Sequence, residues 1–138
     1  MENNSIFIEK LRSSGLRPTK QRIEICKFLF NRKKTFHFTI NDIYKKLEKE
    51  TNKKISLATL YNTVHSFKEK GYLKEISINR ERSYFDTNTS NHHHFLDVNT
   101  NELIDLKNQD VHNIKIKKRI PGKKINSIEV LVKIENSN

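Results

Sequence analysis

The chain has 138 residues, enough for one small domain or for two very small ones that share a dimer interface. Its aromatic content, eight Phe and four Tyr, excludes wholesale disorder, and its single cysteine excludes both an intramolecular disulfide and a Cys-x-x-Cys zinc clamp. The net charge is +11, and no apolar run approaches the roughly 18–20 residues of a membrane span.

The positive charge is concentrated in the front of the chain. Residues 1–91 hold 19 basic and 10 acidic residues, whereas residues 92–138 hold 8 and 6. This distribution favours a front half that binds a nucleic-acid polyanion. A nucleotide-biased genome is an alternative source of part of the charge, because the chain is crowded with Lys, Asn and Ile. The N-terminus lacks the order of a signal peptide, so we expect a cytoplasmic protein with no membrane partner.

Four helices are predicted in the front half from apolar residues at helical spacing and from capping residues. They are expected over residues 5–14, from the N-cap Thr19 to about Phe30, after the N-cap Thr39, and from the N-cap Ser56 to Gly71. In the last of these helices, the apolar spacing predicts four core residues: Leu57, Leu60, Val64 and Phe67.

Strands dominate the rest of the chain. Residues 72–78 and 83–85 are predicted to form a hairpin with a basic tip, which after four helices is typical of a winged helix-turn-helix. Residues 92–98 and 102–106 are expected to pair, followed by a weak helix over 108–117 and a final strand over 125–134. The fold class is therefore α+β: a winged helix-turn-helix over 1–86, a hinge linker over 87–91, and a small α/β dimerisation and sensing domain over 92–138.

The predicted winged helix contains side chains suited to DNA. The second helix of a helix-turn-helix faces the bases, where Asn62 can pair with adenine and Tyr61 can contact a phosphate or a thymine methyl. The full candidate set adds flanking and wing residues: Arg17, Arg22, Ser56, Thr59, Tyr61, Asn62, Arg80 and Arg82. As alternatives, Tyr61 is partly core and the two wing arginines only keep the hairpin tip soluble.

A run of three histidines, His92 to His94, follows the hairpin. Alternate residues of a strand share a face, so His92 and His94 are expected to point together and His93 the other way. Two imidazoles at this spacing can share one metal ion. The alternative is a solvated polar edge.

These segments together resemble the ferric uptake regulator (Fur) family. The resemblance covers about residues 15–106 and is carried by Leu16-Arg17-Pro18-Thr19, by Phe36-His37-Phe38-Thr39, by Leu57-Ala58-Thr59-Leu60-Tyr61 and by the histidine run. It implies a homodimeric, metal-responsive repressor of iron or metal homeostasis genes that binds A/T-rich palindromic double-stranded DNA. It also implies major-groove contact by Tyr61 and minor-groove contact by Arg17.

The resemblance also implies metal ligands. The family's sensor site maps onto His37, Asp86 and Asp105, with His93 or His94 in place of a histidine that falls on Phe95. A second site would use His92, His94 and, less directly, His112. The shell contains imidazoles and carboxylates without thiolate, which suits Fe(II), Mn(II) or Zn(II).

The missing cysteines resemble the iron response regulator branch, which also senses haem, so haem is a second expected ligand. Val98 and Asn101 stand where the first Cys-x-x-Cys pair of many members would fall. Two alternatives remain open: a peroxide sensor whose bound iron oxidises its own histidine, and a winged-helix repressor that responds to no ligand. An enzyme is not expected, because the chain has no His-Glu-x-x-His, phosphate-loop or nucleophile motif.

Overall fold

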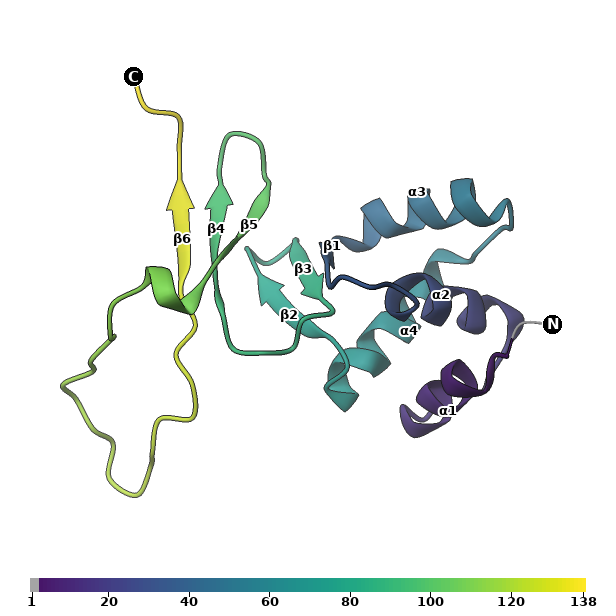
Figure 1. The fold of residues 1–138 in the computed structure, drawn as a ribbon, viewed down its shortest axis with the longest axis horizontal. Helices are drawn as coiled ribbons and strands as arrows, with labels where there is room; N and C mark the ends of the chain where they lie inside the picture. Colours follow the sequence, from purple (N-terminus) through teal and green to yellow (C-terminus); the bar gives the residue numbers. More distant parts are fainter. Residues whose placement is uncertain (1–2) are drawn as a thin grey trace. The chain divides into compact units, whose positions relative to one another are not determined.

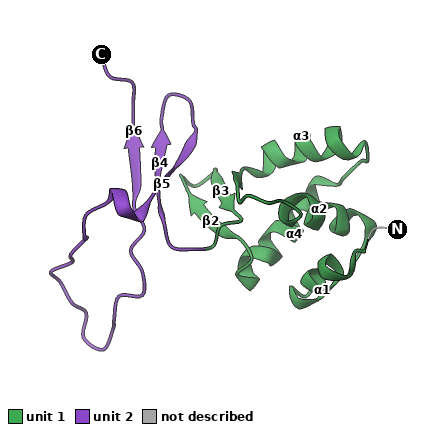
Figure 2. Ribbon diagram, in the orientation of Figure 1, with its two compact units in different colours: residues 1–89 green, residues 90–138 purple. Residues whose placement is uncertain are grey.

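The structure is a computed structural model that describes residues 3–138. The chain forms two compact units, residues 1–89 (unit 1) and residues 90–138 (unit 2), coloured separately in Figure 2. The boundary lies inside residues 87–91, the segment expected to be a linker. None of the helices in the described part of the chain has the length and apolar character that crossing a membrane requires.

Unit 1 contains the four predicted helices (Figure 1): α1 Ser5–Ser13, α2 Lys20–Phe30, α3 Ile40–Thr51 and α4 Leu57–Lys70. The side chains of Thr19, Thr39 and Ser56 each accept the backbone N–H of the residue three positions later, which fixes the starts of α2, α3 and α4 as predicted. Helix α4 ends at Gly71, whose φ of 92° lies in the left-handed region that glycine adopts at least cost.

Unit 1 also contains a three-stranded antiparallel sheet in the order β1-β3-β2. Strands β2 (Lys74–Ser77) and β3 (Ser83–Asp86) form the predicted wing hairpin. Strand β1 (His37–Phe38) was not predicted, because two residues carry no periodicity. It places His37 directly opposite Asp86 on β3.

Fourteen buried apolar residues form one core between the helices and this sheet. Three of the four predicted core residues of α4 lie in it, but Leu57 is 46% exposed. Leu57 is the first residue of the helix, where no preceding turn covers it, so helical spacing alone did not bury it. In α2, Ile25, Cys26 and Leu29 are buried in the same core.

Unit 2 is built on a second three-stranded sheet in the order β5-β4-β6. Strand β4 (His93–Asp97) pairs antiparallel with β5 (Leu103–Leu106) and parallel with β6 (Leu131–Ile134), so β4 is central. The β4–β5 turn falls where it was predicted. It is held by Asp97, whose carboxylate accepts the backbone N–H groups of Asn99 and Thr100.

The predicted helix over 108–117 is wrong. Only a three-residue 3-10 turn forms, η1 (Asn108–Asp110), and residues 111–130 form neither helix nor strand. The β-branched residues Ile114 and Ile116 alternate with lysines instead of repeating at helical spacing, and the like charges that follow would repel along a helix. The final strand is also shorter than predicted, four residues in place of ten.

Candidate metal centre and DNA-facing surface

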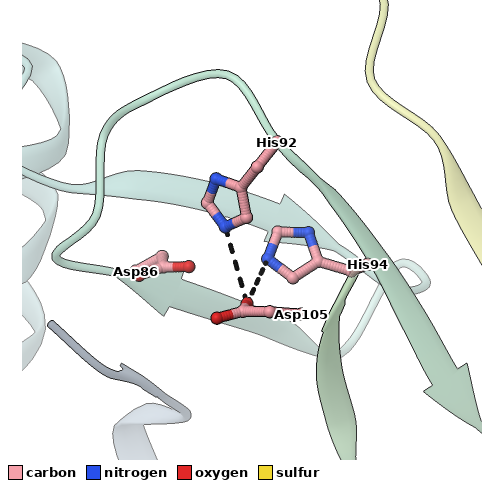
Figure 3. Close-up of side chains that lie close together, drawn as sticks. All are labelled: Asp86, His92, His94 and Asp105. Atoms are coloured by element: carbon pink, nitrogen blue, oxygen red, sulfur yellow. Dashed lines mark ion pairs between the residues drawn. The ribbon is translucent and has the colours of Figure 1, made fainter. Parts of the chain in front are cut away.

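Three side chains of unit 2 converge at one point (Figure 3). The Nε2 atoms of His92 and His94 lie 3.6 Å and 3.4 Å from the same carboxylate oxygen of Asp105. The register places His94 on β4 opposite Asp105 on β5. His92 immediately precedes β4, and its ring lies beside that of His94, with centroids 4.4 Å apart. The cluster therefore forms at the start of β4.

A backbone contact orients the ring of His92. Its Nδ1 lies 2.8 Å from the backbone carbonyl of Ser90. Since a carbonyl only accepts, Nδ1 donates this bond, and Nε2 is the ring nitrogen that faces Asp105. His94 is 4% exposed, whereas 57% of the Asp105 side chain is exposed. The cluster is thus shielded on the imidazole side and open on the carboxylate side.

The spacing of these donor atoms fits a metal ion. Bond lengths of roughly 2.0–2.2 Å in a tetrahedral site place neighbouring ligand atoms about 3.4 Å apart. One ligand atom from each of the three residues lies within 4.8 Å of the others, and the two Nε2–Oδ1 distances match the tetrahedral spacing. Two imidazoles and one carboxylate form a shell suited to Fe(II), Mn(II) or Zn(II).

His93 and His112, the other two histidines expected as ligands in unit 2, lie outside this cluster. The Nδ1 of His93 accepts the backbone N–H of Val130 at 2.9 Å, and the ring is 8% exposed. His93 therefore links β4 to the residue before β6. His112 is exposed in the segment without regular structure.

In unit 1, two of the predicted ligands are neighbours. His37 and Asp86 face each other across β1 and β3. Asp86 is only 2% exposed, and its Oδ1 accepts the backbone N–H of Asn88 at 2.8 Å. A buried carboxylate costs free energy unless it is hydrogen-bonded or bound to a cation, and the N–H of Asn88 supplies one such hydrogen bond.

The predicted recognition surface is exposed on α4. Tyr61 is 50% exposed and Asn62 is also exposed, so the core alternative for Tyr61 does not apply. The Ser56 hydroxyl is engaged as the N-cap that accepts the N–H of Thr59. Ser56 and Thr59 therefore fix the end of the helix that would enter a groove.

Helix α2 holds the start of α4 in place. The side chain of Gln21 accepts the backbone N–H of Ser56 at 3.1 Å, and a shallow groove of about 420 Å³ lies beside this contact. Its lining combines the start of α2 with one residue of α4: Thr19, Lys20, Gln21, Arg22 and Thr59. Sequence reasoning missed Gln21 and Lys20, which only the crossing of α2 and α4 brings to this place.

The candidate arginines occupy two positions in unit 1. Arg17 is exposed, and its backbone carbonyl accepts a hydrogen bond from Arg22 at 2.9 Å, so Arg22 also orders the loop before α2. Arg80 and Arg82 are exposed at the wing tip, where the side chain of Asn79 accepts the N–H groups of Glu81 and Arg82.

His65, which is outside the candidate DNA-binding set, lies against Tyr61. The two ring centroids are 4.8 Å apart at an angle of 33°, and His65 also makes an edge-on ring contact with Phe85. Residues four apart on a helix are neighbours, so the spacing of Tyr61 and His65 was a signal that could have predicted this contact.

The only cysteine is unavailable as a ligand. Cys26 is fully buried, and burial raises the pKa of its thiol to about 12. A thiolate is the form that binds metals, so Cys26 serves as a core residue.

Comparisons with known proteins agree with this fold. Residues 13–133 match the ferric uptake regulator family. The peroxide operon regulator of Bacillus subtilis is 37% identical over 99 residues, which are 72% of this chain and 66% of that protein. The peroxide-responsive repressor PerR of Staphylococcus aureus is 34% identical over 107 residues, covering 78% and 70% of the two chains.

The structural neighbours carry the same architecture. The ferric uptake regulator of Pseudomonas aeruginosa, solved with manganese, superposes with a TM-score of 0.69 at 20% identity, covering 96% of this chain and 99% of that one. The two sequence relatives are peroxide regulators, so they give no support to the iron response branch. The matches nonetheless agree on the family. The chain belongs to the ferric uptake regulator family and is therefore a metal-responsive transcriptional regulator with a winged helix, not an enzyme.

Proposed function

We propose that this protein is a peroxide-responsive repressor whose DNA affinity is controlled by one divalent metal ion held by His92, His94 and Asp105. The observation that carries the proposal is the convergence of the two Nε2 atoms on a single Asp105 oxygen at 3.6 Å and 3.4 Å. The names of the relatives from Bacillus subtilis and Staphylococcus aureus support the peroxide response.

We further propose Asp86 and His37 as metal ligands within unit 1. The family resemblance implies both, and unit 1 has them as cross-strand neighbours. Where metal binding changes DNA affinity, DNA binding changes metal affinity by the same factor, so the two affinities are reciprocally coupled.

Peroxide chemistry follows from the ligand set. His92 and His94 would hold a redox-active ion such as Fe(II), which would supply the electrons that reduce hydrogen peroxide next to their rings. Hydrogen peroxide supplies the oxygen atom that a ring carbon gains, and water is the second product. Mn(II) or Zn(II) in the same shell would support DNA binding without this oxidation.

The DNA target is proposed to be an A/T-rich inverted repeat bound by a homodimer. Asn62 and Tyr61 are exposed on α4, where adenine and thymine present the acceptor, donor and methyl groups that these side chains contact. A dimer places two such helices on half-sites about 34 Å apart, one turn of DNA.

Haem, the other ligand expected from the sequence, is not proposed as the resident cofactor. The thiol that would be its strongest ligand, Cys26, is buried and protonated. The Nε2 atoms of His92 and His94 both face Asp105, which suits a bare cation.

The test is fluorescence anisotropy of a labelled A/T-rich inverted-repeat duplex, titrated anaerobically with the full chain in the presence of Mn(II), Fe(II), Zn(II) or haem. Mn(II) and Fe(II) are expected to tighten binding. Peroxide is then expected to release only the Fe(II)-loaded protein, with a gain of one oxygen atom at His92 or His94 seen by peptide mass spectrometry.

His92→Ala/His94→Ala is expected to bind no metal and to lose the metal-dependent gain in DNA affinity. His112→Ala removes an exposed histidine outside the cluster and serves as the matched control. Retained metal response in the double variant would overturn the metal centre. Release by haem, with no oxygen gained after peroxide, would favour the iron response reading, and indifference to every ligand would leave a ligand-independent repressor.

A further inference from the structure

A second strongly basic element lies in unit 2, far along the chain from the winged helix. Residues 115–124, here called the basic arm, contain six cations in ten positions: Lys115, Lys117, Lys118, Arg119, Lys123 and Lys124. All ten residues are exposed. Unit 2 outside the basic arm has two basic and six acidic residues, so its positive charge is gathered in this one segment.

The basic arm has a defined shape at its tip. The backbone N–H of Lys123 donates to the carbonyl of Ile120 at 3.0 Å, and Gly122 has a φ of 76°. Proline in the second position and a glycine with positive φ in the third are the signature of a type II turn. The turn folds the chain back on itself, so cations stand on both sides of the tip.

The basic arm is anchored at its base. It leaves the sheet after β5 and η1 and returns to β6, which is hydrogen-bonded to β4 (Figure 1). The bond from Val130 to the His93 ring fixes the return. The arm is therefore a tethered loop that extends from the sheet.

None of the six cations forms an ion pair within residues 3–138. Six like charges in ten residues repel one another, and only counterions or an anionic partner offset that repulsion. A polyphosphate backbone is the partner with this charge density. We propose that the basic arm is a second DNA-binding element, which contacts backbone phosphates without reading the base sequence. This inference rests on the proposed function, because it requires that the protein binds DNA.

The experiment measures how the affinity of the Mn(II)-loaded full chain falls with KCl concentration, by anisotropy. One probe is an A/T-rich inverted-repeat duplex and the other a scrambled duplex of the same length. Each phosphate contact contributes about 0.9 to the slope of log affinity against log salt concentration. Loss of one contact therefore weakens binding about fivefold near 0.15 M salt. Lys117→Gln/Lys118→Gln and Lys123→Gln/Lys124→Gln are expected to lower the slope and to weaken both duplexes equally.

The matched control is Lys33→Gln/Lys34→Gln, which removes the same charge from an exposed pair in unit 1. Tyr61→Phe/Asn62→Ala should instead weaken the inverted repeat more than the scrambled duplex. An unchanged slope in the arm variants, or an equal fall in the control, would overturn the inference and leave the proposed function intact. If the wild-type protein binds neither duplex, both the inference and the proposed function are wrong.

The exposed isoleucines of the basic arm suggest an alternative partner, a second copy of this chain. Ile116 and Ile120 are 47% and 56% exposed. Analytical sedimentation of the arm variants distinguishes DNA binding from self-association. If replacing the lysines shifts the protein from dimer to monomer while the salt slope stays constant, the basic arm is a subunit contact and the inference is wrong.

Discussion

Unit 1 and unit 2 differ in what fills their interiors. Among the described residues, unit 1 encloses fourteen apolar side chains in one cluster, whereas the buried side chains of unit 2 are Leu96, Leu103 and the rings of His93 and His94. Burial of apolar surface stabilises a domain roughly in proportion to area, so unit 1 has its own source of stability. Unit 2 must obtain much of its stability from bound ligand or from association.

The largest effect is expected from the core of unit 1. Phe67 is fully buried and packs edge-on against Phe30 at 5.3 Å and Tyr72 at 6.2 Å. Phe67→Ala should lower the free energy of unfolding of unit 1 by about 3–5 kcal/mol. Urea denaturation followed by far-UV circular dichroism measures the loss, with Ile6→Ala, 71% exposed, as the control. A single urea transition in which both units unfold together would break the comparison, because unit 2 would then not be separate.

Metal removal should produce the next largest effect, in unit 2. A ligand that binds only the folded state at 100 times its Kd adds about 2.7 kcal/mol. Chelation of Mn(II) should therefore lower the thermal midpoint of wild-type protein, and His94→Ala should show neither the gain nor the loss. Calorimetry with His112→Ala alongside checks this. If the chelator leaves the thermal midpoint of the wild-type protein unchanged, association between subunits and not metal binding stabilises unit 2.

A smaller effect is expected at the recognition helix. The His65 ring covers one face of Tyr61, and a ring pair of this kind is worth about 0.5–1.5 kcal/mol. His65→Ala should weaken operator binding severalfold by freeing the Tyr61 ring, while His65→Phe, which restores a ring, should recover most of the affinity. Equal loss in both variants would show that His65 acts through its nitrogen atoms and not by stacking.

The smallest effect is expected in the wing, from the ion pair of Lys68 and Glu75 at 3.3 Å. Burial opposes charge on Glu75, but hydrogen bonds from Ser83 and Lys68 and the charge of Lys68 outweigh it and hold the pKa of Glu75 below its ordinary value of 4.5. A lowered pKa stabilises the folded state at pH values above 4.5, and this contribution is lost as the pH falls through the folded-state pKa. The stability difference between wild type and Glu75→Gln should therefore be present at pH 7 and vanish in acid. A difference that is constant across this range would assign the effect to packing.

Most of unit 1 could be predicted from the sequence because its signals are local. Three helices begin at a capping side chain that accepts the backbone N–H of the residue three positions later: Thr19, Thr39 and Ser56. Gly71 marks the end of α4. The pairing of His92 with His94 followed from strand alternation. The features that sequence reasoning missed depend on contacts between distant segments: strand β1 exists only because β3 pairs with it, and Gln21 reaches Ser56 only through the crossing of α2 and α4.

Unit 2 was predicted less well for the same physical reason. The segment after Asn108 has charge and β-branched residues but no period, so neither its lack of a helix nor the parallel pairing of Leu131–Ile134 with β4 could be derived locally. The role of His93 depended on Val130, 37 residues away. No periodicity connects residues at that distance.

The parallel pairing of β4 with β6 also sets an order of events during synthesis. The central strand β4 gains its second neighbour only when His94 pairs with Leu131, 37 residues later in the chain. Contacts between residues so far apart form slowly, because a long loop must close first. The helices, the wing and the apolar core of unit 1 all come from residues before residue 90. During synthesis on the ribosome, the winged helix of unit 1 can therefore fold first. At that stage unit 2, which carries the histidine and aspartate cluster, still lacks β6.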